Sequence, residues 1–183
     1  MPENVMYTPT LETKRLILRP ISKDDIDFIY ELFKRPETNK YSQYANVGSR
    51  KEAEKLFEEF MKPGSPSRFR LIIQLKETRV PIGTVGLHFY SEKHKRAEIG
   101  YNLLHEYWGN GFTSEAVKEV VRYGFNDLCL RRLEATVDPE NLASTRILTK
   151  NNFRYEGRLR KKFFYKGSWH DELLYSIICE EYD

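Results

Sequence analysis

A short glycine-containing turn places the tightest constraint on how this chain can fold. The turn runs over Trp108–Ser114, between residues 97–104, which read as a strand, and a long helical pattern. Gly109 and Gly111 permit backbone conformations that other residues adopt only at a cost. A turn of this kind presents several free N–H groups at a helix start, where the helix dipole adds partial positive charge. The sequence therefore predicts an anion site suited to a phosphate or pyrophosphate.

The same turn differs from two well-known phosphate-binding motifs. No Gly-Lys-Ser/Thr closes it, as in the P-loop, and Ser114 stands where the GxGxxG fingerprint has its third glycine. Thr113 and Ser114 are expected to cap the helix that follows. On these residues alone, a simple capped glycine turn remains the alternative to a phosphate site.

Apolar periodicity predicts an order of elements that defines an α/β or α+β domain with a mixed sheet. Strands are expected at residues 16–19, 69–75, 81–90, 97–104, 133–137, 155–165 and 169–178, and helices at residues 26–33, 53–60, 116–128 and 143–148. Short breaks favour antiparallel pairing among the three strands of residues 69–104, and residues 37–48 are expected to form a loop.

Composition fits one globular domain, expected to span residues 1–183 with a flexible start at residues 1–9. The chain has 183 residues, 40% of them apolar, which is enough for one sizeable core. Its net charge of +3 favours anionic ligands without by itself indicating nucleic acid. The 4 histidines lie far apart in the sequence, so no metal site is predicted.

The cysteines and the apolar runs bear on the compartment. Cys129 and Cys179 form no spaced pair and are expected to be buried thiols in a reducing environment. The first residues lack a signal-peptide pattern, and no apolar run approaches the length of a membrane span. We therefore expect a cytoplasmic protein with no membrane partner.

The glycine turn resembles the acetyl-CoA loop of the GNAT superfamily of N-acetyltransferases, whose pattern is Gln/Arg-x-x-Gly-x-Gly/Ala. Here Trp108 replaces the basic or amide residue, Gly111 is the middle glycine, and Thr113 replaces the final small residue. Further segments carry the resemblance in the family's order: Thr13–Pro20, Glu98–Tyr101, Asn141–Ser144 and Tyr155–Arg160. The set covers nearly the whole chain. The Trp-Gly-x-Gly variant of the turn, followed by Ser-Glu-Ala, looks like the branch containing the ribosomal-protein N-terminal acetyltransferases.

The resemblance implies a seven-stranded mixed sheet with splayed fourth and fifth strands, flanked by about four helices. Acetyl-CoA, with no metal, would lie in the splay. Its pantetheine arm would pair near Asn102 and Leu103, and its pyrophosphate would accept hydrogen bonds from the amides of the glycine turn. The expected cofactor-binding residues are Asn102, Leu103, Trp108, Gly109, Asn110, Gly111, Phe112, Thr113, Ser114, Asn141 and Arg146.

Glu98 is the candidate general base. An ammonium has no lone pair, so acetyl transfer needs a neutral amine and benefits from a base. Strand alternation places Glu98 on one face with Gly100, which is expected to leave space for a substrate. The family often carries a catalytic carboxylate on this strand. The alternatives are a solvated glutamate or a structural ion pair with Arg96 or Lys95.

The usual acid of the family, a tyrosine on the short helix after the fifth strand, is replaced here by Leu148. Ser144 is the expected substitute and would orient or protonate the sulfur, with an ordinary first-turn serine as the alternative. Asn141 resembles the asparagine that binds the cofactor arm and can also act as a helix N-cap. Arg146 would contact a CoA phosphate or only water.

The predicted reaction is acetyl transfer to a primary amine, either the α-amine of a protein N-terminus, such as that of a ribosomal protein, or a small amine. One alternative is an acyl-CoA-binding protein without catalysis. Another is a nucleic-acid or ribosome binder, because cations and aromatics alternate over residues 158–166, although nucleic acid is not favoured. A homodimer is also expected, because several aromatic residues near the last hairpin are expected to be exposed. These residues are Phe163, Phe164, Tyr165 and Trp169.

Overall fold

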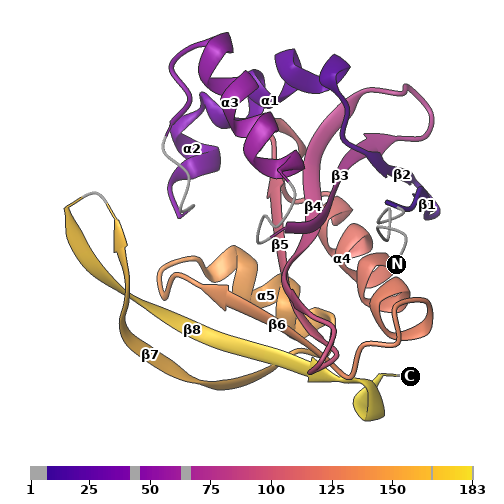
Figure 1. Ribbon diagram of the computed structural model, residues 1–183, viewed down its shortest axis with the longest axis vertical. Helices are drawn as coiled ribbons and strands as arrows, with labels where there is room; N and C mark the ends of the chain where they lie inside the picture. Colours follow the sequence, from indigo (N-terminus) through magenta and orange to yellow (C-terminus); the bar gives the residue numbers. More distant parts are fainter. Residues whose placement is uncertain (1–7, 42–45, 63–66, 166, 183) are drawn as a thin grey trace.

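The computed structural model describes residues 8–41, 46–62, 67–165 and 167–182 and forms an α/β domain (Figure 1). Its eight-stranded mixed sheet has the order β1-β2-β3-β4-β5-β6-β8-β7. The strands are β1 (Leu11–Glu12), β2 (Leu16–Pro20), β3 (Ser67–Leu75), β4 (Pro81–Ser91), β5 (Arg96–Leu103), β6 (Arg132–Val137), β7 (Arg154–Tyr165) and β8 (Ser168–Ile178). The α-helices are α1 (Ile26–Phe33), α2 (Pro36–Asn39), α3 (Arg50–Met61), α4 (Phe112–Asn126) and α5 (Leu142–Lys150), and short 3-10 turns are η1 (Lys23–Asp25), η2 (His105–Tyr107) and η3 (Cys179–Glu181).

The predicted order of strands and helices is confirmed, with two additions. The sheet has eight strands and not seven, because the two-residue β1 pairs with β2. The expected loop at residues 37–48 begins inside the short helix α2, and Pro36 is the first residue of that helix. Proline suits that position because its missing N–H would have no helical partner there. Both elements are too short to produce a periodic sequence pattern, so the periodicity could not reveal them.

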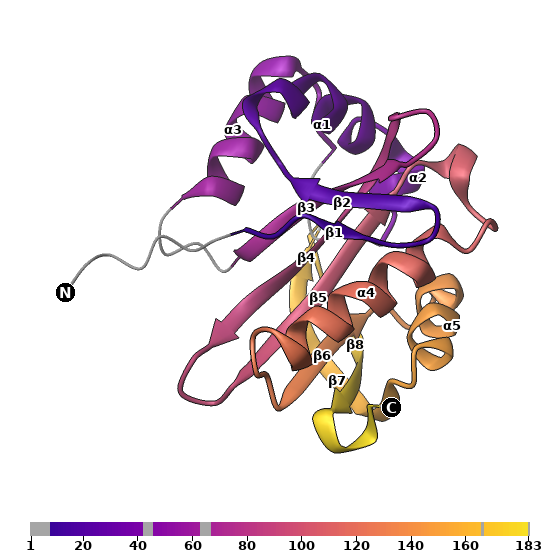
Figure 2. The same ribbon diagram turned by 90° about the vertical axis from the view of Figure 1, so that its right-hand side faces the viewer.

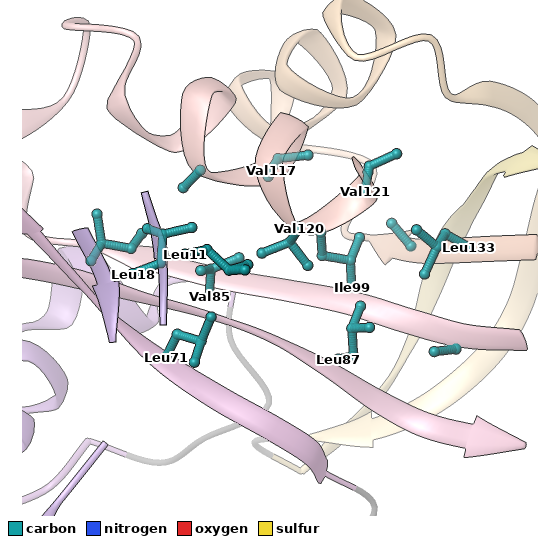
Figure 3. Packing of buried hydrophobic residues seen from close by; sticks show 14 of the residues in the cluster. Leu11, Leu18, Leu71, Val85, Leu87, Ile99, Val117, Val120, Val121 and Leu133 are labelled. Atoms are coloured by element: carbon teal, nitrogen blue, oxygen red, sulfur yellow. The ribbon is translucent and has the colours of Figure 1, made fainter. Parts of the chain in front are cut away.

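The main core lies between the sheet and helix α4 (Figures 2 and 3). Apolar residues recur on one face of α4, and Val117 and Val120 are fully buried against the strands. Ile99 of β5 and Leu133 of β6 lie on the same side of the sheet. A second apolar cluster joins α1 and α3 to the other face around Ile72. The helices therefore cover both faces, as expected for a mixed sheet.

Strands β5 and β6 part soon after they begin. They pair in parallel at only three positions, Arg96 with Arg132, Ala97 with Leu133 and Glu98 with Glu134. Beyond these, β5 remains paired with β4 up to Leu103, and β6 remains paired with β8 up to Val137. The expected splay is confirmed, and it leaves one edge of β5 facing a gap in the sheet (Figure 1).

The structure tests the expectations about the N-terminal stretch, the two cysteines and a membrane span to different extents. Residues 1–7 of the N-terminal stretch expected to be flexible lie outside the described residues. Cys129 is exposed and Cys179 half-buried, so the prediction of two buried thiols is wrong. Cys129 has a φ of 52° in the turn after α4 and points outward, whereas Leu130 beside it fills the core. Over the described ranges, no helix is long and apolar enough to cross a membrane.

Candidate active site

A cavity of about 950 Å³ opens into the splay between β5 and β6. It reaches from the glycine turn before α4 to the inner side of the β7–β8 hairpin, passing the start of α5. The structure brings almost every predicted site residue to its wall: Glu98, Asn102, Leu103, Trp108, Gly109, Gly111, Phe112, Thr113, Ser114, Asn141, Ser144 and Arg146. A volume near the upper end of ordinary ligand sites suits a long, flexible ligand.

The glycine turn presents a row of backbone donors. Gly109 and Gly111 have φ angles of +76° and +78°, in the left-handed region that glycine adopts without strain. Over the described ranges, the amides from Gly109 to Ser114 make no hydrogen bond, and the first bonded helical amide is that of Glu115, 3.1 Å from the Gly111 carbonyl oxygen. The turn therefore fits a pyrophosphate at the positive end of α4.

Two details predicted for the anion site at the glycine turn are corrected. The N-cap of α4 is Gly111 and not Thr113 or Ser114, and no side chain caps the helix. Because glycine caps through its backbone alone, the first helical amides stay available to a ligand. The amide of Trp108 is not available, since it donates to the carbonyl oxygen of His105 at 3.0 Å.

Asn110 is the one predicted cofactor residue that does not line the cavity. Its side-chain amide donates to the carbonyl oxygens of Tyr107 and Trp108, at 3.2 and 3.0 Å. The side chain therefore holds the turn together and can serve a cofactor only through its backbone. The indole N–H of Trp108 likewise donates inward, to the carbonyl oxygen of Leu103 at 2.9 Å.

The free edge of β5 offers backbone groups at alternate residues. The Leu104 amide donates to Ile82 at 2.9 Å, which fixes the phase of the antiparallel pairing between β4 and β5. The N–H and C=O of Asn102 then point to β4, whereas those of Tyr101 and the N–H of Leu103 point into the splay. Asn102 can therefore act only through its side chain, and Tyr101 replaces it as the residue with free backbone groups.

Glu98 stands where the splay begins. Its Oε1 accepts a hydrogen bond from the Thr136 hydroxyl at 2.9 Å. Burial raises the pKa of Glu98, the Thr136 hydrogen bond opposes this, and the carboxylates of Glu172 and Glu134 raise the pKa further. A carboxylate with a raised pKa is a stronger base, as proton abstraction from an ammonium requires.

The structural alternative proposed for Glu98 is not found. Arg96 pairs with Glu134 at 3.0 Å, and Lys95 pairs with Glu92 at 3.2 Å. Neither cation forms an ion pair with Glu98 in the part of the chain that the structure describes. Glu98 is also half-buried, so it is not a fully solvated strand residue.

The space beside Gly100 is filled, contrary to expectation. A Cβ atom at Gly100 would lie 2.9 Å from Nε2 of His88. Burial and, to a lesser extent, the charge of Arg70 lower the pKa of His88 to about 3. The ring is therefore neutral at physiological pH, and its Nε2 lies 3.1 Å from Nη2 of Arg70. Sequence spacing could not show this, because His88 and Gly100 lie on different strands.

The start of α5 forms another wall of the cavity. Asn141 caps the helix by accepting the Ser144 amide at 3.1 Å, which confirms the capping role. The Ser144 carbonyl oxygen lies 3.5 Å from the Tyr101 hydroxyl. Burial raises the pKa of Tyr101 to about 12, so the phenol stays protonated at neutral pH. Leu148, which replaces the family tyrosine, is fully buried in the core.

Tyr101 is a site residue that the sequence reasoning missed. Alternation groups its side chain with those of Ile99 and Leu103, and no pattern in the sequence singled it out as a site residue. In the structure Tyr101 packs against the core and also lines the cavity.

In the described ranges, no group of three or more His, Cys, Asp or Glu side chains is arranged to hold a metal ion.

Comparisons with known proteins agree with this geometry. Residues 15–154 match the family model described as an acetyltransferase (GNAT) domain. The uncharacterized N-acetyltransferase YoaA of Bacillus subtilis is 40% identical over 171 residues, which cover 93% of this chain and 97% of that protein. Spermidine N(1)-acetyltransferase of Escherichia coli is 27% identical over 165 residues, covering 90% and 87%.

A solved structure shares the fold. It is a ribosomal L7/L12 α-N-protein acetyltransferase in complex with coenzyme A, with a TM-score of 0.79 at 20% identity over 91% of this chain and 95% of that chain. The chain therefore belongs to the GNAT family and is an acetyl-CoA-dependent N-acetyltransferase.

Proposed function

We propose that the protein moves the acetyl group of acetyl-CoA onto a primary amine held beside Glu98, by direct attack in a ternary complex. The observation that carries this proposal is a single cavity with the free amides of the glycine turn at one end and Glu98 at the opening of the splay. Acetyl-CoA supplies the thioester. The chain supplies binding, orientation and a base.

Binding and proton transfer fall to different parts of the cavity wall. The amides of Gly109–Ser114 bind the pyrophosphate, and the free edge of Tyr101 and Leu103 holds the pantetheine arm. Glu98 takes the amine proton directly or through water. At pH 7 roughly a tenth of an α-amine with a pKa of ~8 is neutral, against well under a hundredth of a lysine side chain. A base therefore helps with either acceptor.

The α5 side of the cavity serves the cofactor arm and the departing sulfur. Asn141 and Arg146 contact the arm or a phosphate, and the Ser144 hydroxyl orients or protonates the sulfur. The Tyr101 phenol, 3.5 Å from the Ser144 carbonyl oxygen, is a second donor near the same place. A thiol has a pKa of ~8.5, so the leaving group does not need a strong acid.

For the acceptor we propose a protein N-terminal α-amine, with a ribosomal protein as the model, or a small amine. The resemblance to the ribosomal branch supports the first, and the similarity to a spermidine acetyltransferase supports the second. The cavity is lined by carboxylates at Glu37, Glu59 and Glu172 and also by the cations Lys40, Lys62 and Arg70, so its charge by itself does not select the acceptor. We place the protein in the cytoplasm and, as a single domain, in a homodimer.

A thiol-release assay with acetyl-CoA against peptides with free N-termini, polyamines and aminoglycosides tests the reaction. We expect release with at least one class and a fall in kcat of roughly a hundredfold or more for Glu98→Gln. The deficit should shrink between roughly pH 6 and pH 10, because more acceptor is then neutral without help. CoA affinity should stay nearly unchanged.

Other outcomes of the assay point elsewhere. CoA binding without release for any acceptor would favour an acyl-CoA-binding protein. A ratio of kcat values that stays flat with pH, together with lower thermal stability of Glu98→Gln, would make Glu98 structural. Binding of nucleic acid in place of CoA would support the basic strand β7 as the functional surface.

A further inference from the structure

The turn between β1 and β2 binds the first turn of α4 through contacts that lie outside the cavity. Glu115 of α4 accepts hydrogen bonds from the Arg15 backbone amide at 2.8 Å and from the Thr13 hydroxyl at 2.6 Å. Its other oxygen, Oε2, lies 2.7 Å from Nε of Arg15. The contact joins residues 100 positions apart in the sequence. It therefore fixes the start of α4 to the edge of the sheet.

The Arg15 guanidinium also reaches the glycine turn. Its Nη1 donates to the carbonyl oxygen of Asn110 at 3.0 Å. Its Cζ lies 4.5 Å from the centroid of the Phe112 ring, and its Nη2 would lie 3.6 Å from a Cβ atom at Gly111. One side chain thus contacts Asn110 and Phe112 of the glycine turn and lies beside Gly111 between them, although Arg15 does not line the cavity.

The contact with Arg15 also offsets the negative charge of Glu115 next to the anion site. Glu115 follows directly on the last free amide of the anion site, where an isolated carboxylate would repel a pyrophosphate. Partial burial raises its pKa, but the hydrogen bonds from Thr13 and Arg15 hold the pKa of Glu115 below its ordinary value. The carboxylate therefore stays ionised and keeps its partner, and the Arg15 charge offsets it beside the anion site.

We propose that Arg15 is a positioning residue for the pyrophosphate of acetyl-CoA. It holds the segment Asn110–Phe112 so that the free amides face the cavity, and it cancels the charge of Glu115. The proposal rests on the proposed cofactor site. It predicts a defect confined to ligands that carry the pyrophosphate, because the arm and the acceptor bind elsewhere in the cavity.

Three acetyl donors separate this role from general destabilisation. Acetyl-CoA and acetyl-dephospho-CoA both contain the pyrophosphate, whereas S-acetylpantetheine contains no phosphate. For Arg15→Ala we expect the KM to rise about tenfold or more with the first two donors. The kcat should change little, and kcat/KM with S-acetylpantetheine should match that of the wild type.

A matched control is Arg122→Ala, which removes an ion-paired arginine near the far end of α4. It should leave all three donors unaffected. If Arg15→Ala does not fold, Arg15→Lys serves in its place, because an ammonium cannot bond Glu115 and Asn110 with the same fork. Unchanged KM for acetyl-CoA, or an equal loss with S-acetylpantetheine, would overturn the proposal. Failure of the wild type to bind CoA would instead remove the cofactor site itself.

Discussion

At the scale of single residues, the environment of Glu98 suits it to take a proton. The carboxyl group is half-buried, has two other carboxylates nearby and receives one neutral hydrogen bond. The burial and the like charges raise its pKa, while the Thr136 hydroxyl limits the rise. Because the pKa is higher in the folded protein than in the unfolded chain, the contribution of Glu98 to stability is greatest at acidic pH and is lost as pH rises through the folded pKa.

Thr136→Val should raise the pKa of Glu98 further. The substitution removes the hydroxyl that stabilises the charged carboxylate and keeps the side-chain shape. A pH titration of the labelled Glu98 carboxyl by ¹³C NMR measures the shift directly, and the acidic limb of the kcat profile should move up with it. Thr136→Ser keeps the hydroxyl and is the matched control, while Glu172→Gln should lower the pKa. A Thr136→Val protein with the wild-type titration would show that the hydroxyl does not influence Glu98.

At the scale of elements, the splay and the glycine turn together form the proposed cofactor site. Strand β5 has partners on both edges only up to Glu98, and beyond it one edge is left for a ligand. The glycine turn contains two glycines with positive φ, Gly109 and Gly111, and Gly111 is the N-cap of α4. In the proposed cofactor site, backbone groups of the turn and of β5 therefore supply the main contacts, and the Arg15 side chain holds the turn in place.

Gly111→Val should weaken CoA binding about tenfold or more, because a β-branched residue at a φ of +78° is strained by about 1–2 kcal/mol and displaces the turn. Calorimetric titration with CoA measures the change. Gly167→Val is the matched control, since Gly167 has a φ of +79° with nothing near its Cβ position and lies in the β7–β8 hairpin. The control should lose stability but keep CoA affinity. Wild-type affinity in a folded Gly111→Val protein would exclude the turn as the cofactor site.

At the scale of the whole molecule, the last hairpin has two distinct faces. Phe163 and Tyr165 line the cavity, so they are not the exposed aromatics that the sequence suggested. Phe164 and Trp169 are 57% and 60% exposed and make a T-shaped contact, with ring centroids 5.3 Å apart. Strand alternation explains the division, because successive residues of a strand point to opposite faces.

The exposed pair on the hairpin leads us to expect a dimer. Light scattering at roughly 10–50 µM, where weak dimers form, should give twice the monomer mass for the wild type. Trp169→Ser should shift the protein toward the monomer by removing exposed apolar area. Tyr155→Ser, at an equally exposed tyrosine nearer the start of β7, should not. A wild-type monomer throughout this range would contradict the expectation.

The sequence by itself determined the order of the elements, the glycine turn before α4 and the position of Glu98 on its strand. These follow from local causes, since apolar periodicity sets helices and strands and glycine permits positive φ. Tertiary structure alone decided that His88 fills the space over Gly100, that Tyr101 faces the splay and that Arg15 braces the turn. These contacts join residues far apart in the chain, so they depend on strand register and on side-chain direction, and no local pattern encodes them.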